Sequence, residues 1–343
     1  MKIFSRGTML VTGTMLALTA CGGTSGGTAS SASASPVSLK IMVGGLNKQI
    51  YLPNMLAKQL GYFQAQNIDV TLIDEASGQD TEQQVLVGAV DAGSGAYNHT
   101  IELNAKGKFI ETICQFGIAP GEAEVVSSKA SGVSSAADLK GKNLGVTELG
   151  SGTHTLTMAL LGKAGISPDQ VHFVPVGAGD TFLAALKQGN IVAGMTTEPT
   201  IARAIQNGDG KILISMLTPQ DTRTALGGDY PFIGIFAQND WVNGHKDVAQ
   251  RLVNVYVKTL KWMKSHSAEE IADKMPSDYL KPSKDVYVAA LKEQLAIFGS
   301  DCKMPSGGPE TVLKVLQTFV PSFKGKSADL SKTYTNEFAN KAS

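Results

Sequence analysis

The chain repeats one pattern of apolar runs, helical stretches and glycines at an interval of about one hundred residues. Residues 39–98 and 143–199 each open with a short apolar run, continue through a stretch that ends in Leu-Gly, and reach a second apolar run. Each segment closes on Gly-x-[Val/Ile]-x-Ala-Gly, at 88–93 and at 189–194, which we expect to be a strand. Alternating strands and helices are typical of βαβ units with a parallel sheet. The repeat therefore predicts an α/β fold with two similar lobes.

The first 36 residues have the composition of a targeting segment followed by a tether. Lys2 and Arg6 precede an apolar run at 9–20, which is shorter than the ~20 residues that span a bilayer. Small residues then lead to Cys21. This order predicts a signal peptide over residues 1–20. Residues 21–36 are rich in Gly, Ser, Thr and Ala, which predicts a flexible linker.

The residues before Cys21 resemble a bacterial lipobox, although an ordinary signal peptide with an incidental cysteine would look similar. The resemblance implies that Cys21 is lipidated and becomes the new N-terminus. We therefore expect a protein of the periplasm or the cell surface that is anchored to a membrane by the lipid on Cys21.

Two further apolar runs indicate where the chain passes between the lobes. They lie at 109–118 and 230–237, and we expect crossings near 117–125 and 226–236. This predicts a first lobe of residues 37–119 and 233–343 and a second lobe of residues 120–232. From Asp247 onward, apolar residues recur at helical spacing, which predicts C-terminal helices packed on the first lobe. The polar segment 218–228 is expected to be rich in turns.

Charge and cysteine content restrict the partners and the compartment. The chain has 30 basic and 30 acidic residues and no basic stripe, so nucleic acid is not an expected partner. Besides Cys21, the chain contains Cys114 and Cys302. In an oxidising compartment these two could form a disulfide, or they could be two buried thiols. The sequence leaves this choice open.

Several short segments, in this order and spacing, resemble one family of transport proteins. They are 60–63 (LGYF), 138–146 (DLKGKNLGV), 150–154 (GSGTH), 185–189 (ALKQG) and 198–199 (EP). Together they resemble the substrate-binding components of ABC importers for nitrate, sulfonates and taurine, a group that also includes thiamine-precursor binders. Val192 departs from the pattern, because the family often has Asp there, whereas Asp91 retains it in the first repeat.

The resemblance implies a periplasmic-binding-protein fold, in which two lobes joined by two crossing strands close on a small ligand. It also implies delivery of that ligand to an ABC permease in the membrane. We expect a monomer that captures a small anion similar to nitrate, a sulfonate or taurine. A thiamine precursor or an aromatic or heterocyclic acid is the alternative ligand.

The ligand is expected at the carboxyl ends of the strands, where ligands of open α/β sheets bind. The loop 150–153 precedes a predicted helix, and free amides at a helix start favour an anion. Ser151 and Thr153 could donate to the ligand or cap the helix. Glu198 could bind an amine, cap a helix or bridge the lobes, while Arg203 and Arg223 are mobile cations. The candidate ligand-binding residues are Asn47, Gln49, Tyr51, Gln79, Ser94, Tyr97, Asn98, Ser151, Gly152, Thr153, Thr197, Glu198 and Tyr230.

Motifs that would indicate an enzyme are missing from the sequence. The five histidines show no metal-ligand spacing, and neither G-x-S-x-G nor G-x-G-x-x-G occurs where it would be needed. The thiamine-pyrimidine synthases, which are related to the transport family, use a cysteine-rich motif that this chain lacks. We therefore expect no catalytic residues, no metal and no cofactor. A periplasmic enzyme on the same fold is the least favoured alternative.

Overall fold

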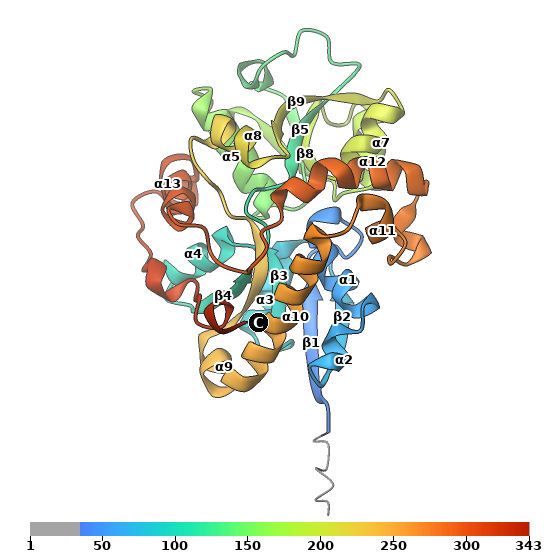
Figure 1. The fold of residues 1–343 in the computed structure, drawn as a ribbon. Coiled ribbons are helices and arrows are strands. Elements are labelled where there is room, and N and C mark those ends of the chain that lie inside the picture. The colour runs from blue at the N-terminus through green and yellow to red at the C-terminus, as the bar shows by residue number, and fades with distance from the viewer. Residues whose placement is uncertain (1–34, 343) are drawn as a thin grey trace, which may run out of the picture. The chain divides into compact units, whose positions relative to one another are not determined.

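The structure is a computed structural model that describes residues 35–342 and contains two five-stranded sheets (Figure 1). The predicted signal peptide, Cys21 and nearly all of the predicted linker lie outside the described residues. The first sheet has the order β2-β1-β3-β10-β4 and the second the order β7-β6-β8-β5-β9. The strands of the first sheet are β1 (Val37–Val43), β2 (Ile68–Asp74), β3 (Ala92–Ala96), β4 (Ile110–Gln115) and β10 (Ile233–Gln238). Those of the second are β5 (Glu122–Ser127), β6 (Asn143–Val146), β7 (His172–Pro175), β8 (Ala193–Thr197) and β9 (Gly210–Met216).

The two sheets have the same internal arrangement. In each, three parallel strands come from the sequence repeat, β1 to β3 and β6 to β8. Each sheet also contains an antiparallel strand next to the third one, β10 in the first sheet and β5 in the second. The chain therefore passes between the sheets before β5 and before β10, and the predicted α/β fold is confirmed. The exact lobe boundaries at 119/120 and 232/233 stay a prediction with which the sheets are compatible.

Helices connect the strands and continue beyond the last one. Those of the repeats are α1 (Leu52–Gln59), α2 (Tyr62–Ala65), α3 (Gly78–Leu86), α4 (Asn98–Asn104), α5 (Gly152–Lys163), α6 (Asp180–Gln188), α7 (Thr200–Gln206) and α8 (Pro219–Leu226). The later ones are α9 (Asn239–Gly244), α10 (Lys246–Lys264), α11 (Ala268–Ala272), α12 (Lys284–Gln294) and α13 (Gly308–Phe319). Short 3-10 turns are η1 (Gln49–Tyr51), η2 (Ala136–Leu139), η3 (Pro168–Gln170), η4 (Ser277–Leu280), η5 (Leu295–Ile297), η6 (Pro321–Phe323), η7 (Leu330–Lys332) and η8 (Ala339–Lys341).

The glycine motifs of the repeat begin before their strands rather than inside them. Gly88 and Gly189 adopt φ values of 72° and 81°, which favour glycine and end the helix before each motif. The strands start later, at Ala92 and Ala193. The prediction of strands over the whole of 88–93 and 189–194 is therefore wrong in its boundaries, because the first glycine terminates a helix.

Segment 218–228 is helical, so the prediction of a turn-rich segment is wrong there. Thr218 caps α8 by accepting a hydrogen bond from the Asp221 amide, and Pro219 occupies the first turn. Gly227 ends the helix with φ 90°. A polar helix with a Thr-Pro start and a glycine stop was readable from these caps.

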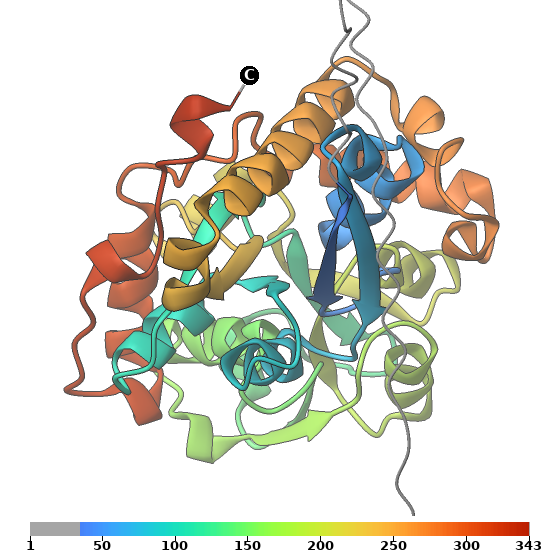
Figure 2. The same cartoon turned by 90° about the horizontal axis from the view of Figure 1, so that it is seen from below.

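The C-terminal helices contact both halves of the molecule. Helix α10, the long light-orange helix of Figure 2, packs against α1, α2 and β4 beside the first sheet. Helix α13 packs on α4 and also on α5, where Phe319 lies against Gly162. Helix α12 packs on η1 and also on α7. The prediction that this block packs on the first lobe is therefore correct for α10 and incomplete for α12 and α13. Residues of α5 share the largest hydrophobic core with the first sheet and the C-terminal helices.

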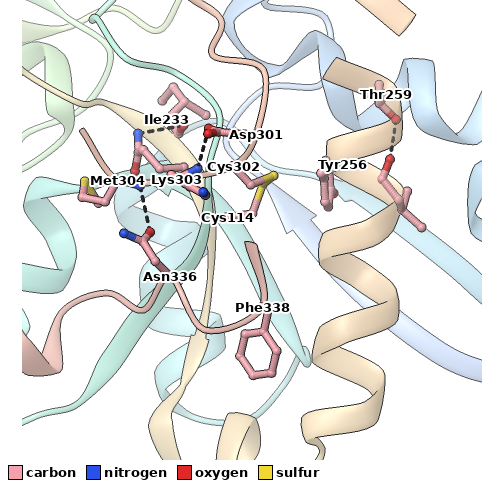
Figure 3. The surroundings of a disulfide bond; sticks show 12 residues. Cys114, Ile233, Tyr256, Thr259, Asp301, Cys302, Lys303, Met304, Asn336 and Phe338 are labelled. Carbon is pink, nitrogen blue, oxygen red and sulfur yellow. Dashed lines mark hydrogen bonds between the residues drawn. A yellow bond between two sulfur atoms is a disulfide. The ribbon is translucent and has the colours of Figure 1, made fainter. Parts of the chain in front are cut away.

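A disulfide joins Cys114 in β4 to Cys302, which follows η5 (Figure 3). The segment beside it is also held by backbone hydrogen bonding, because Gln115 N donates to Cys302 O at 2.9 Å. The covalent link therefore fastens the C-terminal segment to the edge strand of the first sheet. Within residues 35–342, no helix combines the length and the hydropathy required to span a bilayer.

Candidate functional site

A small buried cavity lies where loops from both sheets meet, and we refer to it as the central cavity. Its volume is about 20 Å³, roughly the room for one water molecule. Loops that follow β1, β2 and β3 contribute Gly44, Lys48, Tyr51, Gly78 and His99. The second sheet and its loops contribute Glu122, Ser151, Gly152, Thr153, Thr196 and Thr197. The cavity thus lies at the carboxyl ends of the parallel strands, as expected for an α/β fold.

The start of α5 offers backbone amides to the cavity. The first intrahelical hydrogen bond runs from Thr155 N to Ser151 O, so the amides before Thr155 have no helical acceptor. Ser151 Oγ accepts from His154 N at 3.4 Å, which leaves the amides of Gly152 and Thr153 for a ligand. Partial positive charge at a helix start favours an anionic group there.

The hydroxyl hydrogens of Ser151 and Thr153 are used inside the same loop. Ser151 Oγ donates to Glu148 O at 2.7 Å. In the 2.7 Å contact between the two hydroxyls, Thr153 must therefore be the donor. Thr153 Oγ1 also accepts from Thr147 N at 2.9 Å. These side chains shape the loop, and its donors toward the cavity are the backbone amides.

Glycines allow the two sides of the cavity to approach closely. A Cβ on Gly152 would lie 2.5 Å from the Phe232 ring and 3.2 Å from Ala96 Cβ. A Cβ on Gly44 would lie 2.7 Å from both Gly78 N and the Tyr51 hydroxyl. A side chain at Gly152 would therefore meet the opposite wall, and one at Gly44 would meet Gly78 and Tyr51 on its own side of the cavity.

His99 forms a buried pair with Glu82 behind the cavity. Its Nδ1 lies 2.9 Å from Glu82 Oε2, and both side chains are almost fully buried. Its Nε2 has no hydrogen-bond partner in the described part of the chain and lies near Gly78 and the cavity. Burial alone would lower the pKa of His99, but the Glu82 carboxylate outweighs it and the pKa is raised. A protonated His99 can donate from Nε2.

Lys48 and Glu122 are the other ionisable pair at the cavity. Lys48 Nζ donates to Gly44 O at 2.7 Å and to Ala76 O at 3.0 Å. Glu122 is 3% exposed, and its Oε2 has no hydrogen-bond partner among residues 35–342. Burial raises the pKa of Glu122 to about 8 and lowers the pKa of Lys48 to about 8, and the opposite charge of each partner limits both shifts.

Burial also raises the pKa of Tyr51, with the Glu122 charge adding to the effect. Tyr51 therefore remains a neutral phenol that can donate a hydrogen bond. The central cavity thus combines several donors with one unpartnered carboxyl group.

A wider recess of about 410 Å³ adjoins the central cavity and shares Lys48 and Ala178 with it. Asn47 and Tyr279 line one side, and Arg203, which pairs with Asp180, lines the other. This recess is large enough to admit a small solute to the cavity walls. Arg223 lies elsewhere and pairs with Asp229 at 2.7 Å.

The residues expected to bind ligand separate into three groups in the structure. Five of them line the central cavity: Tyr51, Ser151, Gly152, Thr153 and Thr197. Asn47 lines the outer recess. The remaining ones line neither space: Gln49, Gln79, Ser94, Tyr97, Asn98, Glu198 and Tyr230.

Most residues of the third group have structural partners that account for them. Gln49 Nε2 donates to Tyr287 O, and Ser94 Oγ accepts from Asn54 Nδ2. The Tyr97 hydroxyl contacts Thr333 Oγ1 at 2.6 Å, and Asn98 Nδ2 donates to Glu102. These contacts hold the four side chains within the fold, and their contact with a ligand stays a prediction.

Gln79 and Tyr230 lie close to the site without lining it. Gln79 Oε1 lies 2.7 Å from the position of a Cβ on Gly150, so it faces the α5 loop from the other side. Tyr230 is fully buried, and its hydroxyl has no partner in the described chain.

Glu198 performs two of the three roles that the sequence left open. Its carboxylate accepts from Ala202 N at 2.9 Å and so caps α7. Its backbone oxygen accepts from Gln49 N at 3.0 Å, which links the two halves of the molecule. Burial raises the pKa of its carboxyl group to about 7.

Sequence reasoning missed His99, Glu122, Lys48 and Thr196. Glu122 could have been identified from the sequence, since a carboxylate in an apolar strand is rarely buried unless it is paired or functional. His99 directly follows two named candidates, and Lys48 lies between two others. The Glu82 partner of His99 had no such signal, because only the fold brings α3 and α4 together.

Two sheets, two crossings and a cavity at their facing edges define the class of bilobed ligand-binding proteins. The chain belongs to the NMT1/THI5-like family, whose model matches residues 50–270. The resemblance to nitrate and sulfonate binders that the sequence indicated is confirmed by the relatives of this family.

Solved structures and curated proteins show what this chain is similar to. A solved protein from Bordetella bronchiseptica is 35% identical with a TM-score of 0.85, covering 89% of this chain and 96% of that one. The ligand-binding component of an ABC-type import system from Staphylococcus aureus is 17% identical, with a TM-score of 0.69 and coverage of 90% and 99%. The periplasmic nitrate-binding protein of Synechocystis is 13% identical, with a TM-score of 0.72 and coverage of 89% and 88%. The last two show a shared fold.

The 4-amino-5-hydroxymethyl-2-methylpyrimidine phosphate synthase of Legionella pneumophila is 29% identical over 127 residues, which are 37% of this chain and 39% of the synthase. The chain spans about two fifths to a half of the length of the curated relatives that it matches. The curated relatives of this chain therefore include both a synthase and a nitrate/nitrite binding protein.

Proposed function

We propose that this protein is the solute-binding component of an ABC import system. It captures a small solute with an acidic group, of the nitrate, sulfonate or taurine type, and delivers it to a membrane permease. The observation that carries the proposal is that several hydrogen-bond donors converge on the central cavity. These donors are the amides at the start of α5, the Tyr51 hydroxyl and His99 Nε2.

The cavity is suited to binding by closure. Its walls come from both sheets, and its volume of about 20 Å³ leaves no room for a solute larger than water unless the walls separate. Hinge bending at the two crossings would open it, and the bound solute would hold the walls together. The wider recess beside it is the side from which a solute would enter.

We further propose that the protein acts as a monomer in the periplasm or at the cell surface, held by lipid on Cys21. Transport relatives named as periplasmic support this compartment. Membrane fractionation of cells that express the Cys21→Ala variant tests the anchor, and an unchanged membrane fraction would refute it.

A synthase among the relatives favours a second candidate, in which the ligand is a thiamine precursor or another heterocyclic acid. The protein would still be a binder, because the cavity contains a carboxyl group, a histidine and a lysine without the cysteine-rich motif of those synthases. Turnover of a bound heterocycle by the isolated protein would instead establish an enzyme.

Thermal unfolding with a panel of solutes tests the function. A ligand present at a hundredfold excess over its Kd stabilises the folded protein by about 2.7 kcal/mol. Nitrate, alkanesulfonates, taurine and aminopyrimidines form the panel, and native mass spectrometry identifies any solute that co-purifies. The proposal fails if no compound shifts the midpoint and the protein as purified carries no small molecule.

A further inference from the structure

Glu122 is the one carboxyl group that lines the central cavity. It is the first residue of β5 and is 3% exposed, and its Oε2 has no hydrogen-bond partner within residues 35–342. A buried polar atom without a partner costs free energy, and most such atoms in proteins are satisfied. An atom of the solute is therefore the natural partner of Glu122 Oε2.

The neighbouring charges do not supply that partner. Lys48 Nζ is occupied by the carbonyl oxygens of Gly44 and Ala76, although its charge acts on Glu122. His99 is occupied at Nδ1 by Glu82. Each cation therefore has one carboxyl group beside it, and with both carboxyl groups ionised the charges around the cavity sum to zero.

A site in which the positive and negative charges cancel favours a solute whose own charges cancel. The amides at the start of α5 favour an acidic or acceptor group on the side of the second sheet. When it is ionised, Glu122 offers an acceptor that a simple anion such as nitrate would leave unpaired. A solute that carries both an acidic group and a donor group would pair with the amides at the start of α5 and with Glu122.

We infer that the solute carries an amino group that donates to Glu122 Oε2, together with an acidic or acceptor group at the start of α5. The inference rests on the proposed function and narrows its ligand from a simple anion to a net-neutral, amino-bearing compound. An aliphatic aminosulfonate and an amino-substituted heterocyclic acid share this chemistry.

Glu124 provides a matched control on the same strand. It lies two residues from Glu122, so the two side chains point to the same face of β5. It is fully buried and accepts from Thr157 Oγ1 at 3.3 Å, yet it does not line the cavity. Burial raises the pKa of each carboxyl group to about 8. Glu122→Gln and Glu124→Gln therefore remove similar buried acids, of which only Glu122 faces the solute.

Calorimetric titration of the full protein separates the possibilities. The probes are taurine and ethanesulfonate, which differ by the amino group, and an aminopyrimidine carboxylate together with the same compound lacking its amine. Hydrogen bonds to charged groups contribute ~1.5–3 kcal/mol, so the favoured amine should bind about 10- to 150-fold more tightly than its matched partner. Glu122→Gln should abolish this preference, Glu124→Gln should keep it, and Glu122→Asp should keep part of it.

The pH dependence gives an independent readout. Since Glu122 must be ionised to accept from an ammonium group, binding of the amine should tighten from pH 6 to pH 8. Binding of ethanesulfonate should weaken over the same interval, because a protonated Glu122 is the better neighbour for an anion. Other titratable groups also face this region, namely Lys48, Tyr51 and the His99–Glu82 pair. The decisive quantity is therefore the difference in pH dependence between amine binding and ethanesulfonate binding, which the Glu122→Gln variant must lose.

The outcomes distinguish a failure of this inference from a failure of the proposed function. If simple anions bind as tightly as amines, or if Glu122→Gln leaves the preference intact, the inference is overturned and the binding function stands. If no probe binds and native mass spectrometry finds no solute, the proposed function fails as well. A co-purified solute whose composition contains no amino nitrogen would also overturn the inference.

Discussion

The two sides of the central cavity differ in what they present to a solute. The first sheet contributes ionisable or phenolic side chains, namely Lys48, Tyr51 and His99. The second sheet contributes backbone amides at the start of α5 and threonine hydroxyls, and its one ionisable group is Glu122. The same βαβ repeat has thus produced two different surfaces, because its loops differ while its strands correspond.

The two sides also differ in the hydrophobic cores and the covalent link that hold them. The first sheet shares the largest hydrophobic core with α5 and the C-terminal helices, whereas the faces of the second sheet have two smaller cores. The disulfide fastens the C-terminal segment to β4 of the first sheet. We expect the first side to be the more rigid one, although α5 of the second side belongs to the same large core, and the predictions below test whether the second side moves.

Removal of the disulfide should produce the largest effect and should fall on the first side. The bond links residues separated by 188 positions, and chain entropy predicts a contribution of about 5 kcal/mol at most. Cys114→Ser with Cys302→Ser should therefore lower the free energy of unfolding by about 3–5 kcal/mol. Chemical denaturation measures this loss, and the wild type under reducing conditions should match the variant.

Hydrogen exchange of the same variant tests the comparison between the sides. Amides of β4 and of the segment around Cys302 should lose more protection than those of β6 and β8. Equal loss in both sheets would show that the molecule is one cooperative unit without a separate rigid support. Neither cysteine lines the central cavity, so the solute affinity of the folded variant should be unchanged.

Gly152→Ala should produce the next largest effect, on closure. Its Cβ would lie 2.5 Å from the Phe232 ring, so the second side could not reach its position against the first. Overpacking of this kind costs ~1–3 kcal/mol, which corresponds to roughly 5- to 150-fold weaker solute binding. Calorimetry measures the affinity, and thermal unfolding without solute measures the fold.

Gly244→Ala is the matched control, since a Cβ there meets no atom within 4 Å. It should leave the solute affinity unchanged. If Gly152→Ala destabilises the solute-free fold by as much free energy as it costs in solute binding, Gly152 packs permanently and the second side does not move.

The fold was largely predictable because its repeat depends on local patterns. Apolar runs, the Leu-Gly stops and the paired glycine motifs are visible in the sequence, and they predicted the succession of strands and helices along the chain, although not the order of the strands within each sheet. The contacts of α12 and α13 were not predictable, because an amphipathic helix shows that it packs but not on which surface. The start of α8 was overlooked although Thr218 and Pro219 mark it.

The candidate site was predictable at the level of loops and less so at the level of side chains. The loop 150–153 could be located because a glycine-rich turn before a helix has a general chemistry. The pairing of His99 with Glu82 depends on the packing of α4 beside α3, which no local pattern encodes. Glu122 was passed over because its strand was identified from the apolar residues that follow it.

The smallest effect on affinity should come from the hydroxyls of Ser151 and Thr153. The second side presents amides, and both hydroxyl hydrogens are donated within the loop. Ser151→Ala with Thr153→Ala should therefore change solute affinity by less than about threefold, while loss of the helix cap lowers stability by ~0.5–2 kcal/mol. Calorimetry and thermal unfolding of one preparation measure both quantities. A tenfold or greater loss of affinity without a matching loss of stability would show that the hydroxyls turn toward the solute when it binds. The contrast between the two sides would then weaken, because the second side would recognise the solute through these hydroxyls as well as through its amides and Glu122.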